Sequence, residues 1–553
     1  MNIKKYFSEA FIFDLKAGFI TAIVALPLAI AFAIASGVPP IMGLYTAIIA
    51  GILGSSFGGS RFSITGPTGA MTVIILATVN KFGIEGLLLA GLLAGILQLG
   101  FGALNFGKLV KYIPLPIISG FTSGIGVIIF IGQLANFLGL SIPPHEFIWT
   151  NVREIIFHLP NSSLLAISIA LGTLVILHFY PLLAEKNRFL RNIPASILAL
   201  IFFTAITIYF ALDIPVVGDI PSGLPSFSLL NFNLDLVRQV LPSAFTIALL
   251  GAIEALLCAV VCDGMTNTKH DSDKELRSQG IANIVIPFFG GIPSTAAIAR
   301  SAVNIREGAK TKYSGVIHAL FLLLILLVFA PVAKFIPTAF LAGILMFVSL
   351  NMININEFFT ISRISRSDTA VLAITFLLTV FTDLVFAVQV GMFLAIFLLF
   401  IRLTKMTDIS HMEEYDKKNG INFRIYANPL LEENITIYTI HGPFFFGAMN
   451  VFDRKLNEHM HMKKPIIILR MTHVPFIDST GVARLNSFLM ERQREHKTVY
   501  LTELSNAAEK VLFRDHTFTS LMEKEHIFGT TGAAIDYAEK SLIASREKEQ
   551  ETK

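Results

Sequence analysis

Two short segments that lie far apart in the sequence share one unusual order of residue types. Residues 65–73 read TGPTGAMTV and residues 291–299 read GIPSTAAIA. In both, a glycine and a proline precede a hydroxyl residue and a run of small residues. Proline can occupy the first turn of a helix without losing a needed donor, and a helix N-terminus carries roughly half a positive charge. Two such N-termini facing each other would bind an anion without a formal cation.

These two segments supply six candidate anion-binding residues. Serine and threonine can cap a first turn and donate to an oxyanion, and glycine and alanine let a ligand approach the backbone. The candidates are Thr68, Gly69, Ala70, Ser294, Thr295 and Ala296. A single Gly-Pro pair is also typical of an ordinary loop between membrane spans. A matched pair in corresponding positions of two halves is instead the pattern of a transporter's binding site.

Two charged residues within apolar sequence are candidates for the same site. Glu254 stands in LLGAIEALLCAVV, with no polar side chain for several residues on either side. An acid inside a span is costly unless paired or hydrated, so we expect it to carry a coupling proton; the alternative is a structural role at the broken helices. Arg300 lies six residues beyond Ser294. Its charge would strengthen the anion site, or it could instead reach toward the cytoplasmic face.

Membrane-spanning helices are the elements that would position these residues. Of the 553 residues, 54% are apolar and 15% are charged, whereas globular domains average about 45–50% apolar and about 25% charged. Residues 17–405 form successive apolar runs, mostly about as long as a bilayer is thick. We expect fourteen spans, near 17–36, 41–57, 68–80, 83–104, 116–138, 162–180, 194–212, 240–262, 278–291, 294–303, 313–330, 337–350, 368–382 and 384–403. The prediction is a mainly α-helical membrane protein whose transport domain covers residues 1–405, with half-helices at about 68–80 and 294–303.

The basic residues between the spans predict the topology. If both termini are cytoplasmic, the loops on that side are rich in Lys and Arg, and the opposite loops carry Lys81, Arg153, Arg238 and Lys334. This asymmetry follows the positive-inside rule. We therefore expect a multi-pass protein of the cytoplasmic (inner) membrane, embedded in the lipid bilayer, with cytoplasmic N- and C-termini.

The sequence changes character after Arg402. Residues 406–430 are polar and read as a linker, and residues 431–545 alternate short apolar strands, such as ITIYTI and PIIILR, with amphipathic helices. This alternation predicts a small cytoplasmic α/β domain. Residues 546–553 are expected to form a solvated tail.

Three stretches, in order, resemble the SulP family of anion permeases, which are related to animal sulfate, chloride and bicarbonate transporters and to prestin. The first two are GLYTAIIAGILGSSFGGSRFSITGPTGAM (43–71) and SQGIANIVIPFFGGIPSTAAIARSAVNIREGAKT (278–311). The third, IILRMTHVPFIDSTGVARL (467–485), is similar to the centre of a STAS domain. The resemblance implies fourteen helices in a core and a gate domain and an elevator-like movement, usually in a homodimer. LPLAIAFA (26–33) and LPSAFTIA (241–248) echo each other and, with the half-helix pair, indicate a seven-plus-seven inverted repeat.

The resemblance also assigns roles to single residues. It implies that Phe32 closes the anion pocket, although an aromatic residue there could equally be packing. In bicarbonate transporters of the family, an Asp and a Thr that help to bind sodium match Glu254 and Cys258. Because sulfur is a poor ligand for a hard cation, this departure favours protons over Na⁺ as the coupling ion. In stand-alone STAS proteins the serine that matches Ser479 is phosphorylated; the alternative for the Asp478-Ser479 pair is a plain helix cap.

The leading interpretation is a secondary active transporter of a small inorganic or dicarboxylate anion, working as a proton-coupled, sulfate-type symporter. The alternatives are an uncoupled anion exchanger, a sodium-coupled bicarbonate transporter, and a membrane sensor that binds an anion and signals through STAS to a cytoplasmic partner. The sequence shows no nucleophile–base pair, phosphate-binding loop or redox motif, so we expect no enzyme. We also expect no metal and no cofactor. The net charge of +4 gives no indication of a nucleic-acid partner.

Overall fold

The structure is a computed structural model that describes residues 10–108, 114–143, 148–184, 193–219, 221, 223–230, 232–382, 384–411, 428–459 and 464–551. It divides into two compact units, Met1–Ala395 and Ile396–Lys553. Each unit has its own hydrophobic core.

The first unit is built almost entirely from helices. Its α-helices are α2 (Phe11–Ala35), α3 (Pro40–Phe57), α4 (Gly69–Ala103), α5 (Leu115–Gly132), α6 (Leu134–Phe137), α7 (Ile148–His158), α8 (Leu164–Ala184), α9 (Ala195–Tyr209), α10 (Leu234–Thr266), α11 (Ser272–Val285), α12 (Ile298–Arg306), α13 (Tyr313–Ala333), α14 (Thr338–Met352), α15 (Ile355–Ile364), α16 (Arg366–Phe381) and the first part of α17 (Leu384–Met406). The described part of this unit also contains two 3₁₀ turns, η2 (Leu159–Asn161) and η4 (Ile286–Phe289), and two short strands, β1 (Thr65–Gly66) and β2 (Thr295–Ala296).

Within the described residues, nine helical segments are long and apolar enough to cross a membrane. One of them, α4, covers two predicted spans, which separate at Gly83 with φ 70° and ψ −174°. Only glycine adopts such backbone angles readily. The helices α9, α11, α12 and α16 have at most 16 residues each. The fold is thus a multi-helical membrane fold, and the count of fourteen spans remains a prediction.

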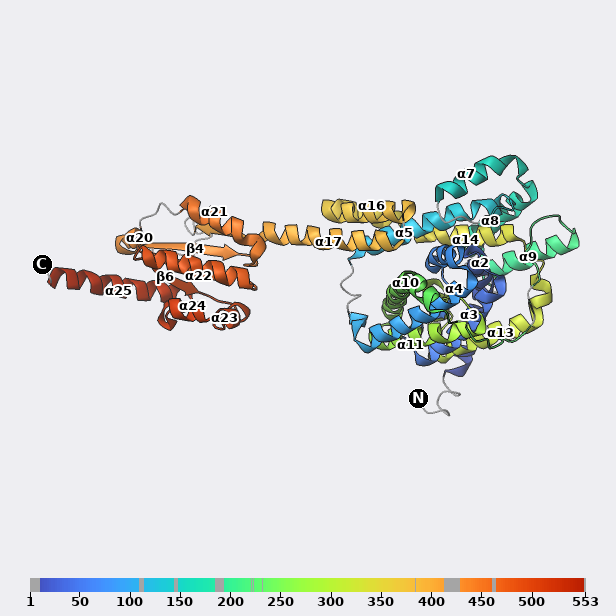
Figure 1. The fold of residues 1–553 in the computed structure, drawn as a ribbon, viewed down its shortest axis with the longest axis horizontal. Coiled ribbons are helices and arrows are strands. Elements are labelled where there is room, and N and C mark those ends of the chain that lie inside the picture. Colours follow the sequence, from blue (N-terminus) through green and yellow to red (C-terminus); the bar gives the residue numbers. More distant parts are fainter. Residues whose placement is uncertain are drawn as a thin grey trace. The chain divides into compact units, whose positions relative to one another are not determined.

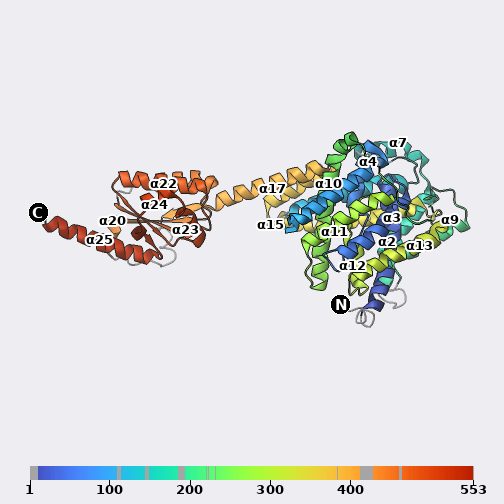
Figure 2. The ribbon, with the colours of Figure 1, turned by 60° about the horizontal axis from the view of Figure 1, so that its bottom comes forward.

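The helices of this unit pack in two groups. In the first, α4 contacts α10 and α11, α3 contacts α11 and α13, and α2 contacts α3, α12 and α13. In the second, α14 contacts α5 and α8, and α5 contacts α16. Figures 1 and 2 show the first group as blue helices from the start of the chain beside green helices from its middle. Both Gly-Pro segments belong to this first group.

Small residues let the helices of the first group approach each other closely. A Cβ on Gly95 of α4 would lie 2.6 Å from the backbone nitrogen of Ile284 in α11. A Cβ on Gly280 of α11 would lie 2.5 Å from the backbone nitrogen of Leu99 in α4. These backbones meet directly, which is the usual way in which membrane helices pack without a hydrophobic driving force.

The second unit is a five-stranded sheet with helices on both faces. The strand order is β3-β4-β5-β6-β7, with β3 antiparallel to β4 and the other pairs parallel. The strands are β3 (Asp408–His411), β4 (Ile435–His441), β5 (Ile466–His473), β6 (Thr498–Thr502) and β7 (Ile527–Phe528). The helices are the end of α17, α20 (Pro429–Asn434), α21 (Met449–His459), α22 (Ser479–Arg494), α23 (Asn506–Leu512), α24 (His516–Leu521) and α25 (Thr531–Glu551), with 3₁₀ turns η5 (Phe446–Ala448) and η6 (Lys524–His526).

Alternating side chains of the strands form two cores, one on each face of the sheet. One core joins β4–β6 to α22, α23 and α24, and the other joins them to α20 and α25. The sheet begins inside the segment predicted as a linker, because β3 pairs with β4. Residues 412–427 of that linker lie outside the described residues. The helix α25 continues into the predicted tail, through residue 551.

Candidate functional site

The two Gly-Pro segments meet at one short pair of strands. β1 (Thr65–Gly66) runs antiparallel to β2 (Thr295–Ala296). Just beyond β2, the backbone N–H of Ala297 donates to the carbonyl of Ile64 at 2.8 Å. α4 and α12 therefore leave a common point, which we call the crossing point of β1 and β2.

Both helices leave the first backbone N–H groups of their N-termini without a side-chain cap. α4 follows Thr68 and α12 follows Ala297; both residues are extended, and neither side chain accepts a bond from the helix. The first N–H groups of a helix have no acceptor within the helix and form the positive end of its dipole. An anion at the crossing point would accept hydrogen bonds from these groups.

The α12 side departs from the predicted arrangement. The helix begins at Ile298 rather than at Ser294, because Thr295 and Ala296 are extended and paired as β2. The Ser294 hydroxyl and N–H both donate to Oδ1 of Asn283, at 3.1 and 2.8 Å. The Thr295 hydroxyl donates to the carbonyl of Gly251 at 2.8 Å. These side chains hold the segment within the protein, so the N–H groups available to an anion belong to the first turn of α12.

On the α4 side, Thr68, Gly69 and Ala70 lie at the start of the helix, and Glu254 reaches it from α10. The Thr68 hydroxyl donates to Oε2 of Glu254 at 2.8 Å. Glu254 and Ala70 also line a cavity of about 20 Å³ between α10 and α5, which is room for about one water molecule. A change in the charge of this carboxyl group would therefore act directly on the first turn of α4.

Phe32 packs against the same turn. A Cβ on Gly69 would lie 3.3 Å from Cε1 of Phe32, so the glycine leaves space for the ring. Leu28 lies one turn earlier on α2 and is buried with Phe32 in the hydrophobic core. The structure thus places Phe32 beside the crossing point. This position fits both expected roles of the ring, packing in the core and closing the anion pocket.

Arg300 is buried behind the crossing point and does not reach an exposed end of α12. Its side chain is 1% exposed, and its Nη2 donates to the carbonyl of Pro67. Its Nη1 has no hydrogen-bond partner among the described residues and lies beside Gly66, where a Cβ would clash. Among the described residues no ion pair joins Arg300 to Glu254. Both instead bind the Pro67-Thr68 segment.

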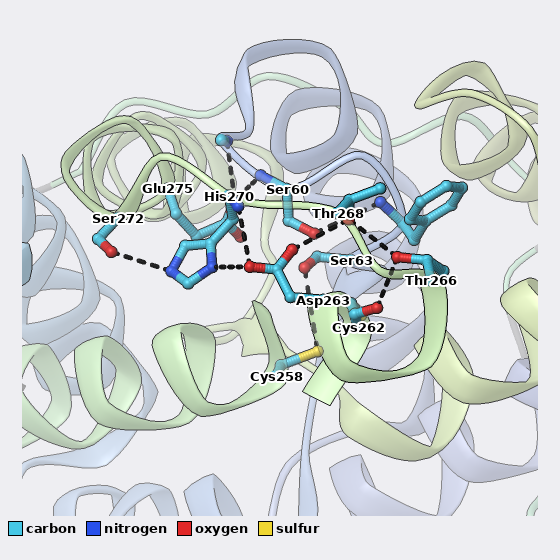
Figure 3. A network of polar contacts seen from close by, with 12 residues as sticks. Ser60, Ser63, Cys258, Cys262, Asp263, Thr266, Thr268, His270, Ser272 and Glu275 are labelled. Carbon is cyan, nitrogen blue, oxygen red and sulfur yellow. Dashed lines mark hydrogen bonds and ion pairs between the residues drawn. The ribbon is translucent and has the colours of Figure 1, made fainter. Parts of the chain in front are cut away.

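Cys258 connects α10 to the crossing point from the other side. Its thiol donates to the Ser301 hydroxyl at 3.2 Å. The thiol also lies 4.0 Å from the Ser63 hydroxyl (Figure 3). The Ser301 hydroxyl also accepts the N–H of Ile64 at 2.8 Å. The sulfur of Cys258 is thus engaged with two serines, one on each side of the crossing point.

A separate polar network orders the turn between α10 and α11 (Figure 3). Nδ1 of His270 lies 2.7 Å from Oδ2 of Asp263, and its Nε2 lies 2.9 Å from the Ser272 hydroxyl. The buried carboxylate of Glu275 accepts the N–H of Ser60 at 2.9 Å. These bonds fix the ends of the two helices that carry residues of the site.

Three buried polar residues near the site were missed by the sequence analysis. Asn283 binds Ser294, and Thr46 of α3 accepts the N–H of Ile292 at 2.7 Å. His318 of α13 is fully buried, and within the described residues neither of its ring nitrogens has a hydrogen-bond partner. A polar residue inside an apolar span was the available signal for each of them.

In the second unit, Asp478 caps α22 by accepting the N–H of Gly481 at 2.8 Å. Ser479 is the first residue of that helix and is exposed. A cap and an accessible serine are therefore both present, and phosphorylation of Ser479 remains a prediction.

Comparisons with known proteins agree with this architecture. The sulfate permease family matches residues 11–375, and the STAS domain matches residues 426–534. A putative sulfate transporter of Bacillus subtilis is 39% identical over 537 residues, covering 95% of this chain and 98% of that protein. A bicarbonate transporter of a Picosynechococcus strain is 32% identical over 505 residues, covering 88% of each chain.

A solved structure extends the comparison to the fold. The murine Solute Carrier 26 family member A9 anion transporter, in its inward-facing state, has a TM-score of 0.84 at 20% identity, covering 97% of this chain and 93% of that one. At this identity the likeness concerns the fold alone. The family match and the two bacterial relatives carry the assignment: this chain belongs to the sulfate permease family and has a C-terminal STAS domain.

Proposed function

We propose that the protein is a secondary transporter that binds a small inorganic or dicarboxylate anion at the crossing point of β1 and β2. Two uncapped helix N-termini and the charge of Arg300 support this proposal. The bacterial relatives are named as sulfate and bicarbonate transporters, so sulfate and bicarbonate are the first substrates to test. The transport reaction needs no enzyme chemistry and no cofactor.

We further propose that transport is coupled to protons through Glu254. The single observation that carries this proposal is the hydrogen bond from Thr68, the residue before α4, to the Glu254 carboxylate. Each helix N-terminus contributes roughly half a positive charge, so an ionised Glu254 offsets about as much charge as the two N-termini supply. A protonated Glu254 leaves that charge free for the anion. Proton and anion binding then strengthen each other, as linkage requires.

Other parts of the proposal concern the coupling ion and the assembly. Sodium is the less favoured coupling ion, because Cys258 offers sulfur and its thiol is bound to Ser301. We propose an elevator-like movement of the α2–α4 and α10–α13 group against the group of α5, α8, α9, α14 and α16. The protein would act as a homodimer in the inner membrane, with both termini in the cytoplasm and the STAS domain free to bind a cytoplasmic protein, regulated through Ser479.

The test is uptake into proteoliposomes with and without an inward proton gradient, using sulfate and bicarbonate as separate substrates. Wild-type uptake is expected to exceed the gradient-free rate several-fold. Glu254→Gln should remove the stimulation by the gradient, because its amide cannot exchange a proton. Uptake by Glu254→Gln is expected to persist at a rate that no longer depends on pH.

Glu357→Gln is a matched control. Glu357 also accepts one hydroxyl bond, from Ser119 at 2.7 Å, but it lies on α15, which contacts α5 and α16 of the other helix group. Its replacement should leave the gradient dependence unchanged. Uptake that ignores the gradient in the wild type would rule out symport and favour an uncoupled exchanger; stimulation by a sodium gradient would favour sodium coupling.

A further inference from the structure

The amide of Asn283 uses every one of its bonding groups close to the crossing point. Asn283 is fully buried on α11. Its Oδ1 accepts the N–H of Ser294 at 2.8 Å and the Ser294 hydroxyl at 3.1 Å. Its Nδ2 donates to the Ser294 carbonyl at 2.9 Å and to Oε1 of Gln98 at 2.8 Å. One side chain thus binds the backbone of Ser294 on both sides.

Gln98 extends this contact to two more helices. It lies in the second half of α4, is also fully buried, and its Nε2 donates to the carbonyl of Ala248 in α10 at 3.3 Å. Gly251, one turn further along α10, makes room for it, because a Cβ there would lie 2.5 Å from Nε2. We call Asn283 and Gln98 together the amide bridge. It joins α4, α10 and α11 to the segment that precedes α12.

The segment before α12 depends on such contacts for its orientation. Ser294 lies four residues before Ile298, and the residues between them are extended, so no helical hydrogen bond orients them. Buried, fully satisfied polar networks fix a unique arrangement. We propose that the amide bridge positions the N-terminus of α12 for anion binding, so that Asn283 and Gln98 are positioning residues of the transport site. This inference rests on the proposed function.

An amide suits this place better than a carboxylate would. Asn283 must donate and accept at once, whereas an ionised carboxylate can only accept. A carboxylate would also add a negative charge beside the helix N-terminus that attracts the anion. Asn283→Asp would keep the two bonds from Ser294 but lose the two in which Nδ2 donates. Asn283→Leu would lose all four without adding a charge.

α12 offers a matched control at its other end. Asn304 is also a fully buried asparagine, and its Nδ2 donates to the carbonyl of Phe62 at 3.3 Å and to the Ser314 hydroxyl at 2.9 Å. Asn304→Leu removes a buried amide from the other end of the same half-helix, and this amide makes no bond to Ser294. A general loss of packing should therefore affect both variants, whereas a loss of positioning should affect only the Asn283 variants.

The experiment measures KM and maximal uptake rate for sulfate and bicarbonate in proteoliposomes of the full-length protein, together with the melting temperature. Asn283→Asp and Asn283→Leu should raise KM by about tenfold or more, the effect of losing two or more hydrogen bonds, with a smaller change in maximal rate. Asn304→Leu should lower the melting temperature and leave KM within about twofold, since it removes no bond to the segment before α12.

The pH dependence separates positioning from simple packing. A protonated carboxyl group can again both donate and accept, so Asn283→Asp should regain part of its affinity, relative to wild type, as the pH is lowered. Asn283→Leu should not. If the Asn283 variants fail to fold, Gln98→Met tests the inference in their place. It removes the other member of the amide bridge and should raise KM severalfold. Wild-type uptake with unchanged KM in the folded variants would overturn this inference alone; no anion binding or uptake by the wild type would overturn the proposed function.

Discussion

The two half-helices leave the same pair of strands, but the protein holds their N-termini in different ways. On the α4 side, the hydroxyl of Thr68 binds a carboxylate, Glu254. On the α12 side, Ser294 and Thr295 bind neutral groups, the amide of Asn283 and the carbonyl of Gly251. One side of the candidate site is therefore tied to a group that can gain a proton, and the other is tied to groups that cannot.

Under the proposed function, this difference would give each side a separate task. A helix N-terminus held by neutral partners presents the same positive potential at every pH. A helix N-terminus that shares its first turn with a carboxylate presents a potential that depends on protonation. The anion would thus be held by the α12 side and controlled by the α4 side. Single substitutions on the two sides should then have different signatures.

The largest effect is expected at Arg300, which belongs to both sides. It is part of α12, and its Nη2 donates to the carbonyl of Pro67 just before α4. The attraction between an anion and a cation several ångströms away is on the order of 2 kcal/mol at an effective dielectric constant of about 20, so Arg300→Met, which removes the cation, should raise the Kd for the anion roughly 10- to 100-fold. Binding titrations with sulfate and bicarbonate would measure this change.

Arg306→Met is the control for Arg300, because Arg306 is an exposed arginine at the end of the same helix. It should bind anions like the wild type. Arg300→Lys keeps the charge but lacks the planar guanidinium group. Its Kd for the anion should lie between those of Arg300→Met and Arg306→Met. Equal losses in Arg300→Met and Arg306→Met would mean that Arg300 acts only through net charge.

A smaller and more selective effect is expected from two matched threonines. The hydroxyls of Thr68 and Thr295 each donate one bond of 2.8 Å, to Glu254 and to the Gly251 carbonyl. Valine has the same branched shape, so Thr68→Val and Thr295→Val remove little besides these bonds. Thr68→Val should shift the pH at which uptake is half-maximal; Thr295→Val should leave it in place and lower stability by about 1 kcal/mol.

Uptake measured over a range of pH, together with thermal unfolding, separates the two threonine variants. The comparison between the two sides fails if both variants shift the pH profile equally. The comparison also fails if neither variant shifts the pH profile while both proteins remain folded, because Glu254 would then act independently of α4.

The crossing point illustrates what a sequence can and cannot predict about such a site. The matched Gly-Pro segments indicated where the helices break and that the two breaks belong together, because these residues impose their conformation locally. They did not indicate that Ser294 binds Asn283 or that Thr295 binds Gly251. Each hydroxyl could cap its own turn or bind a distant partner, and only the packing of α10 and α11 decides between these outcomes.

The second unit shows the same limit in another form. Buried parallel strands such as Ile466–His473 are recognisable as apolar runs, and the α/β domain was predicted from them. β3 (Asp408–His411) lies in the segment that the sequence predicts to be a linker, because a short antiparallel strand at the edge of a sheet has no apolar run to mark it. Its place follows from pairing with β4, which is a tertiary contact.

The smallest effect is expected at Ser294, where the sequence and the structure lead to opposite predictions. If the Ser294 hydroxyl donated to the anion, its removal in Ser294→Ala would raise KM about tenfold, as expected for the loss of a charge-assisted bond. In the structure, however, Oδ1 of Asn283 accepts both the hydroxyl and the N–H of Ser294. The N–H bond survives in Ser294→Ala and still satisfies the amide oxygen. KM should then change by no more than about threefold, and the pH profile should match that of the wild type.

A tenfold rise would place the hydroxyl in the anion site and would require the Asn283 contact to open during transport. A small change in KM would mean that the α12 side binds the anion through its backbone N–H groups. These groups do not titrate, so the potential on that side would stay constant with pH.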